Sequence, residues 1–236
     1  MVSTVSGRET NIGQDCGKKY FGADFETMTR RFERDVTEKE NREKLASFAL
    51  QLDGLRARIA QLKTQERGAN WVHRQAQPLL DSSKGCPTAL LRHISSMVKT
   101  RNPVLMTQRE ATEREIEDMQ ARQGRGVTRP QYIDEPLAEV AGLEALYPEN
   151  DLRQLLVIEL EENLRKFDGE DIDAMGYEAL RRWARWVGTV EATLETATAA
   201  IEHGRRLLIR ENLEPFDQVL DDPDDRIRFG KYLKSL

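Results

Sequence analysis

The chain contains few of the residue types on which many common protein functions depend. Only two cysteines, Cys16 and Cys86, and three histidines occur among 236 residues. Two cysteines cannot supply the framework of a disulfide-rich protein, and reduced thiols are typical of cytoplasmic proteins. Aromatic residues make up 6% of the chain and charged residues 33%. This balance is typical of helical proteins with much solvated surface.

Long apolar runs are also missing. The longest uninterrupted aliphatic run is Leu155–Ile158, far short of the roughly 20 residues that span a bilayer. The first eleven residues are polar and contain no apolar run like that of a secretory signal. We therefore expect a soluble cytoplasmic protein with no membrane partner.

Charge is distributed unevenly along the chain. The net charge is −5, yet residues 54–109 carry 10 basic and 2 acidic side chains, whereas residues 130–236 carry 13 basic and 24 acidic ones. No carboxylate occurs between Ser82 and Arg109. A basic middle and an acidic C-terminal half indicate either an anionic partner or attraction between the two parts of the chain.

Two long stretches carry apolar residues at alternating steps of three and four, the spacing of a coiled-coil stripe. The first stripe lies in a predicted helix over about residues 24–67 and comprises Leu45, Phe48, Leu52, Leu55, Ile59 and Leu62. The second lies in a predicted helix over about residues 171–212 and comprises Leu180, Trp183, Val187, Val190, Leu194, Ala197, Ile201, Gly204 and Leu208. Phe25, Met28 and Phe32 form a shorter, earlier stripe in a shifted frame.

Such stripes cannot remain in water, because each buried Leu or Ile contributes roughly 1.5–3 kcal/mol. They need other helices as cover, and the small residues Ala197 and Gly204 would allow close helix packing. No strand pattern of convincing length is visible. The sequence therefore predicts an all-α fold, an elongated helical bundle with two long coiled-coil-like helices and several shorter ones.

Composition divides the chain into four segments. Residues 1–23 contain a Gly-rich stretch, 11–22, that we expect to form a structured loop. Residues 24–123 form a basic helical region, residues 124–130 a Gly/Arg linker, and residues 131–236 an acidic helical region. Shorter helices are predicted over about 87–100, 103–123, 135–146 and 150–167, with a terminal helix after Asp222.

Several motifs resemble ligand sites only in part. Gly13, Gly17, Lys18 and Lys19 fall one residue short of a phosphate-binding loop, and Lys19 replaces the hydroxyl that would hold magnesium. The four potential zinc ligands Cys16, His73, Cys86 and His93 lack clustered spacing. Asp171, Asp173 and Gly176 resemble the start of a calcium loop, but Arg182 stands where the closing glutamate belongs. We expect Asp171 and Asp173 to cap a helix instead.

Catalytic motifs are equally weak. Neither Gly-x-Ser-x-Gly nor His-Glu-x-x-His occurs. Glu159, Glu161 and Glu162 could pair in a metal-dependent hydrolase, but glutamates on helices usually form a solvated face. We name no catalytic, cofactor-binding or metal-binding residue and expect no cofactor.

Two basic clusters remain. The first lies in the segment 54–109, where cations could neutralise phosphates beside Trp71, and comprises Arg56, Arg58, Lys63, Arg67, Arg74, Lys84, Arg92, Lys99, Arg101 and Arg109. It could equally face the acidic half of the chain. The second surrounds Trp183 and Trp186 with Arg181, Arg182 and Arg185, which suit partner binding or mere solubility.

These patterns favour a non-enzymatic helical interaction protein, acting as a homo-oligomer or a subunit of a complex, with the two stripes as interaction sites. The first alternative is a nucleic-acid-binding or regulatory protein that uses residues 54–109, shielded by the acidic half. The second is a metal-dependent enzyme with a carboxylate site between helices. The sequence identifies neither the partner nor the oligomer number.

Overall fold

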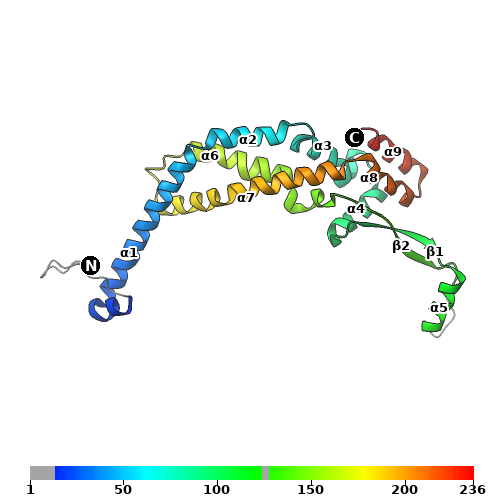
Figure 1. Cartoon of the computed structure of the whole chain (residues 1–236), viewed down its shortest axis with the longest axis horizontal. Helices are drawn as coiled ribbons and strands as arrows, with labels where there is room; N and C mark the ends of the chain where they lie inside the picture. Colours follow the sequence, from blue (N-terminus) through cyan, green and yellow to red (C-terminus); the bar gives the residue numbers. More distant parts are fainter. Residues whose placement is uncertain (1–13, 124–127) are drawn as a thin grey trace. The chain divides into compact units, whose positions relative to one another are not determined.

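The computed structural model describes residues 14–123 and 128–236 (Figure 1). Contacts divide the chain into two compact units that are each discontinuous in sequence. Unit 1 comprises residues 1–53 and 165–189, and unit 2 comprises residues 54–164 and 190–236. Among the described residues, no helix is both long and apolar enough to cross a membrane. The fold is mostly helical, which confirms the predicted fold class.

Unit 1 is built from α1 (Gln14–Ala49), the end of α6 (Glu162–Asp168) and the beginning of α7 (Tyr177–Leu207). The predicted long helices pack together here, with Leu45 and Leu180 fully buried. Lys44 donates a hydrogen bond to the carbonyl of Ala184 at 2.8 Å, and Arg42 donates to the carbonyls of Ile172, Asp173 and Met175. The C-terminal half of α1 is therefore held against α7 and the turn before it.

An aromatic cluster fills the core of unit 1. The ring of Phe48 lies 5.5 Å from those of both Phe167 and Trp186, and the rings of Phe167 and Trp183 are 5.3 Å apart. These edge-to-face pairs are the arrangement that aromatic quadrupoles favour. Trp183 therefore belongs to the core, as its place on the predicted stripe indicates.

Unit 2 surrounds the rest of α7 with short helices. These are α2 (Leu52–Thr64), α3 (Ala69–Leu80), η1 (Ser82–Lys84), α4 (Thr88–Thr100), η2 (Leu143–Leu146), η3 (Pro148–Asn150), the π-helical η4 (Gln154–Glu161), α8 (Arg210–Leu213), η5 (Glu214–Val219) and α9 (Pro223–Leu233). The terminal helix begins as predicted, because Asp222 caps it by accepting from the amide of Asp224 at 2.8 Å.

A two-stranded hairpin in unit 2 corrects the expectation of a chain without strands. β1 (Val104–Glu110) pairs antiparallel with β2 (Tyr132–Glu139), with a register irregularity at Leu105/Met106. α5 (Glu113–Gln123) follows β1. The helices predicted over 103–123 and 135–146 were therefore wrong in part. Each strand is stabilised by a partner far away in sequence, which a local pattern does not reveal.

Three predicted boundaries also differ. The Gly-rich stretch expected as a loop is helical from Gln14 onward, and residues 11–13 lie outside the described part. The helix predicted over 24–67 is interrupted at Leu50 and Gln51, where neither glycine nor proline signals a break. The predicted linker 124–130 lies between the paired strands and thus inside unit 2, with residues 124–127 outside the described part.

Candidate partner-binding groove

The helix α3 is clamped on one side by the C-terminal elements of unit 2. Gly204 of α7 lies against Val72, and a Cβ at this glycine would overlap the valine methyl groups. The hydroxyl of Tyr232 donates to the carbonyl of Gln75 at 2.9 Å. Helix α3 therefore packs closely against α7 and is bonded to α9. The sequence predicted a close helix contact at Gly204 because this residue is small.

The turn that leads into α3 is equally constrained. Arg67 has a positive φ of 48°, and a Cβ at Gly68 would lie 2.6 Å from the carbonyl oxygen of Leu62. Arg205 donates to the carbonyls of Glu66 and Arg67, both at 3.0 Å. This glycine and this arginine determine where α3 begins relative to α2.

Three adjoining cavities are lined in part by α3, and we call them together the α3 groove. The first, of about 230 Å³, is lined by Lys63, Ala69, Asn70, His73, Leu152, Arg153, Leu156 and Val157. The second, of about 130 Å³, shares His73 and Leu152 and adds Val72, Ala76, Gln77, Leu80, Ala145, Leu146, Tyr147, Pro148, Asn150 and Asp151. The third, of about 460 Å³, shares Leu80 and adds Leu79, Ser82, Thr88, Leu91, Arg92, Ile94, Ser95 and Val98.

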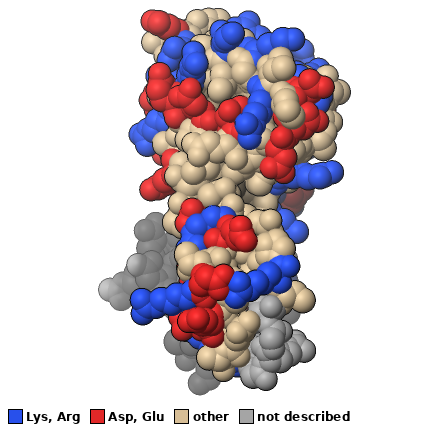
Figure 2. Space-filling view, turned by 90° about the vertical axis from the view of Figure 1, so that its right-hand side faces the viewer, with Lys and Arg blue, Asp and Glu red and all other residues tan. Residues whose placement is uncertain are grey.

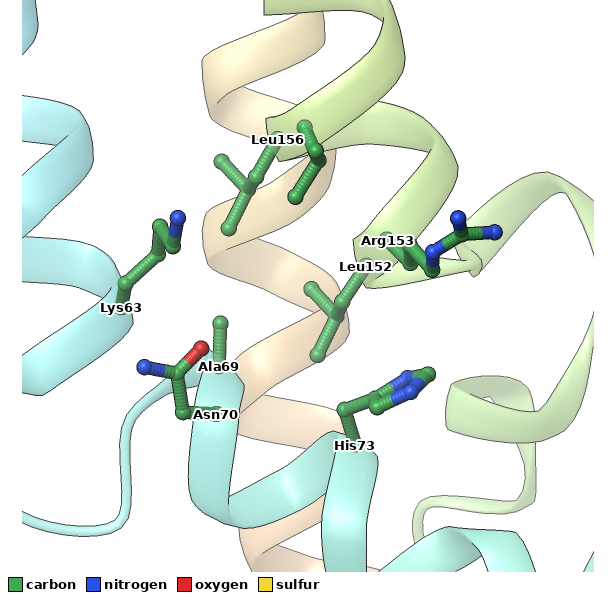
Figure 3. Close-up of a pocket in the computed structure, with 8 residues that line it drawn as sticks. Lys63, Ala69, Asn70, His73, Leu152, Arg153 and Leu156 are labelled. Atoms are coloured by element: carbon green, nitrogen blue, oxygen red, sulfur yellow. The ribbon is translucent and has the colours of Figure 1, made fainter. Parts of the chain in front are cut away.

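Polar groups border an apolar floor in the first cavity. In Figure 3, Lys63 and Asn70 lie on one side and His73 and Arg153 on the other, with Leu152 and Leu156 between them. Lys63 is neutralised within the chain, because its ammonium group contacts both oxygens of Glu161 at 2.8 Å. The floor can therefore take an apolar side chain while the border offers hydrogen-bond donors.

The groove carries more positive than negative charge. Arg92 and Arg153 are exposed and form no ion pair with any residue in the described part of the chain. Asp151 is the acidic lining residue, and its carboxylate accepts from the amides of Arg153 at 2.8 Å and Gln154 at 3.3 Å. This carboxylate thus caps the helix that follows, and among the described residues it forms no ion pair with either guanidinium group.

One wall of the first cavity is π-helical. The segment η4 (Gln154–Glu161) supplies Leu156 and Val157 to the lining, and Leu155, Leu156 and Leu160 are buried. π-helical segments are rare and frequently occur at functional sites. The continuous apolar run Leu155–Ile158 marked this segment in the sequence, but a helical period alone does not reveal the π conformation.

The predicted stripe residues lie mainly in the core of their own unit. Buried are Leu45, Phe48, Leu52, Ile59, Leu180, Trp183, Val190, Leu194, Ile201 and Leu208, and half-buried are Leu55, Leu62 and Val187. Because these side chains are already covered within the chain, the partner surface that we propose below lies elsewhere.

The predicted basic segment is partly neutralised by the acidic half. Arg58 pairs with Glu191 at 2.5 Å, Arg101 with Glu149 at 2.6 Å, and Lys63 with Glu161 as described above. Arg109 binds both Glu115 and Glu135 at 2.7 Å. Arg67 lies over the ring of Trp71, and Arg56 has a partner of its own. Within the segment 54–109, the exposed cations that form no ion pair with any described residue are Arg67, Arg74, Lys84, Arg92 and Lys99.

Charges of both signs also mix on the surface. On the face drawn in Figure 2, Lys and Arg side chains alternate with Asp and Glu, and the described residues there form no large patch of one sign. Ion pairs between residues far apart in sequence therefore make the surface charge more even than the net charges of the separate segments suggest.

The partial phosphate-loop motif and Cys16 involve residues whose side chains lie outside the described part, and the potential metal ligands that are described are not brought together. Cys86 is buried, and burial raises the pKa of its thiol to about 12, which opposes the thiolate form that binds zinc. Among the described residues, no group of three or more His, Cys, Asp or Glu side chains is placed to hold a metal ion. Asp171 accepts from the amides of Asp173 at 3.0 Å and Ala174 at 3.3 Å in a turn that precedes α7. Because α7 begins only at Tyr177, the prediction that Asp171 and Asp173 cap this helix was wrong.

Sequence reasoning missed most of the groove. Its cations Lys63 and Arg92 belong to the predicted basic segment, but Arg153 and the apolar residues Leu80 and Leu152 were not singled out. Neighbouring cavities form only when α3, α4 and η4 come together in the fold, and no local spacing in the sequence predicts this.

The chain matches no protein family model, and no curated protein or solved structure is significantly similar to it.

Proposed function

We propose that the protein is a non-enzymatic interaction protein that binds a partner protein through the α3 groove. The partner segment that fits is an amphipathic helix with apolar residues on one face and carboxylates beside them. The observation that carries this proposal is the row of apolar cavities bordered by guanidinium groups without ion-pair partners.

The shape of the groove supports a helical ligand. The three cavities follow α3, which has 12 residues and is therefore about 18 Å long at 1.5 Å per residue. A docked helix inserts anchors at positions i, i+3 or i+4, and i+7, which cover about 10 Å. Successive cavities along α3 can thus receive successive apolar anchors.

Exposure of an apolar side chain at the centre of the groove supports the same conclusion. Leu80 lines two of the cavities and is 52% exposed. Covering such a side chain with a partner removes apolar surface from water at about 25 cal/mol per Å². The floor therefore supplies affinity.

The charges select the ligand. Arg92 and Arg153 lie in the outer two cavities, one at each end of the groove. Planar guanidinium groups bind carboxylates in a two-pronged geometry. An acidic segment would satisfy both arginines, whereas a basic segment would be repelled. The border therefore supplies specificity and orientation.

Nucleic-acid binding through residues 54–109 stays a prediction. Carboxylates within the chain already pair with Arg58, Lys63, Arg101 and Arg109, and these pairs would have to open for phosphates to bind. The experiment below includes nucleic acid as a competing outcome.

The test is a fluorescence-anisotropy titration of the full chain with three labelled probes at low salt. The probes are a designed helical peptide with leucines on one face and glutamates elsewhere, the same peptide with lysines for glutamates, and a double-stranded oligonucleotide. We expect saturable binding of the acidic peptide alone. Binding of the oligonucleotide alone, or of none of the probes, would overturn the proposal.

Matched variants locate the binding surface. Leu80→Glu should abolish binding of the acidic peptide, whereas Ile227→Glu, at a residue 56% exposed on α9, should leave it unchanged. Arg153→Glu with Arg92→Glu should weaken binding roughly tenfold, about 1.4 kcal/mol. Arg74→Glu changes charge on α3 outside the cavity lining and should have little effect.

A further inference from the structure

The first half of α1 carries an apolar stripe that its own unit does not cover. Met28 is 63% exposed, Phe32 69% and Val36 38%. Their spacing of four residues places them on one side of the helix. Every residue from 30 to 36 is exposed, and the start of α7 approaches this part of α1 on one side only, where Arg34 lies over Tyr177 (Figure 1).

The stripe points away from the rest of unit 1. Arg34 lies two residues, and so about 200°, from Phe32 on the helix. Its guanidinium carbon is 4.8 Å from the centre of the Tyr177 ring at the start of α7. The side of α1 opposite the stripe is therefore the side that meets α7. A bare helical segment of this length is marginal in water, so a partner on the stripe would stabilise it.

We infer that this stripe pairs with the same stripe of a second copy of the chain, with the two helices antiparallel and centred on Glu33. In that register, position n of one helix lies level with position 66 − n of the other. Along the axis of the pair, the apolar side chains come from the two copies in turn. Met28 of the first copy is followed by Val36 of the second, and Phe32 of the first by Phe32 of the second. Val36 of the first copy is then followed by Met28 of the second. Successive levels differ by two residues, or about 3 Å, so each side chain fills the space between two others.

Charge on one flank of the stripe supports the same register, whereas on the other flank Glu33 of each copy lies level with Glu33 of the other. Arg31 and Asp35 are four residues apart and lie on the same flank of the stripe. Both are exposed, and neither forms an ion pair with any other residue in the described part of the chain. In an antiparallel pair this flank meets its own copy, so that Arg31 of each helix lies level with Asp35 of the other. Two intermolecular ion pairs then border the apolar stack.

The sequence around the stripe favours a second copy over a partner of one charge. Residues 26–36 contain three basic side chains, Arg30, Arg31 and Arg34, and three acidic ones, Glu26, Glu33 and Asp35. A net charge of zero selects neither an acidic nor a basic partner. The surface is small beside a standard interface of about 1,600 Å², so the dimer is expected to be weak, with a Kd on the order of micromolar.

Sedimentation velocity on the full chain at increasing concentration tests this inference. We expect a shift from monomer to dimer, which Phe32→Glu abolishes without changing the circular dichroism, because this side chain is exposed. Arg31→Glu should weaken dimerisation at least tenfold, and Arg31→Glu combined with Asp35→Arg should restore it. A wild-type chain that stays monomeric, or a double variant that stays as weak as the single one, would overturn the proposed pairing.

Cysteine cross-linking tests the orientation. Met28→Cys and Val36→Cys are made separately in a Cys16→Ser background, where Cys86 is buried and resists reaction. Mixing the two variants should give the cross-linked heterodimer in excess over either homodimer. Efficient cross-linking of each variant to itself would indicate a parallel pair and contradict the register. These results do not depend on peptide binding to the α3 groove, so the two proposals fail separately.

Discussion

The lack of a side chain at Gly204 sets the distance between α7 and α3. A Cβ there would overlap Val72, whereas a Cβ at Gly54, an exposed residue of α2, would meet nothing within 4 Å. Both glycines lie in helices and carry the same entropic disadvantage of roughly 0.5–1 kcal/mol relative to alanine. They differ only in what surrounds them, and this makes them a matched pair.

Gly204→Ala is expected to destabilise the protein by about 1–3 kcal/mol through overpacking. Gly54→Ala is expected to stabilise it by roughly 0.5–1 kcal/mol. Urea unfolding of both variants measures the difference, and Val72→Ala added to Gly204→Ala should recover part of the loss by removing the overlap. Equal stability of Gly204→Ala and the wild type would contradict the close contact.

At the scale of elements, α5 is held by a reciprocal cap. The amide of Thr112 donates to Glu115 Oε2 at 2.8 Å, and the amide of Glu115 donates to the Thr112 hydroxyl at 3.4 Å, the arrangement of a capping box. Arg109 on β1 donates to both oxygens of the Glu115 carboxylate. This arginine and the hydrogen bonds from Thr112 hold the pKa of Glu115 well below its usual range.

This lowered pKa predicts that α5 loses stability in acid. Ionised Glu115 stabilises the folded state fully above its ordinary pKa of 4.5, and the contribution is lost as pH falls towards the lower pKa of the folded state. The helical Cα chemical shifts of α5 should decrease over that range. Glu115→Gln should already show weakened α5 at neutral pH and little further change in acid.

Asp118→Asn is the control, because Asp118 lies in the same helix outside the cap. It should behave like the wild type. If the Cα chemical shifts of α5 in the wild type stay constant down to the lowest pH at which the protein is folded, the cap does not stabilise α5.

Helices with an apolar stripe could be predicted from sequence, and elements defined by distant partners could not. The stripe from Leu180 to Leu208 predicted α7, and the terminal helix predicted after Asp222 is α9. The hairpin needed pairing between Val104 and Glu139, which lie far apart in the chain. The α3 groove likewise needs α3, α4 and η4 together, so the sequence revealed some of its cations but not its floor.

At the scale of the whole molecule, folding pairs charges that the sequence separates. The basic segment 54–109 and the acidic residues 130–236 meet within unit 2 through Arg58, Lys63 and Arg101. This pairing leaves Arg92 and Arg153 available at the α3 groove. The uneven distribution of charge along the sequence therefore supplies ion pairs within the fold, and we propose that the remaining unpaired cations bind a partner.

Methyl NMR of the full chain can show whether the α3 groove receives an acidic amphipathic helix. We expect the designed acidic peptide to shift the methyl signals of Leu80, Leu152, Leu156 and Val157. The signals of Leu45 and Leu180, buried in unit 1, should stay unchanged. Unchanged groove methyl signals at saturating peptide, or shifts confined to other surfaces, would contradict binding in this groove.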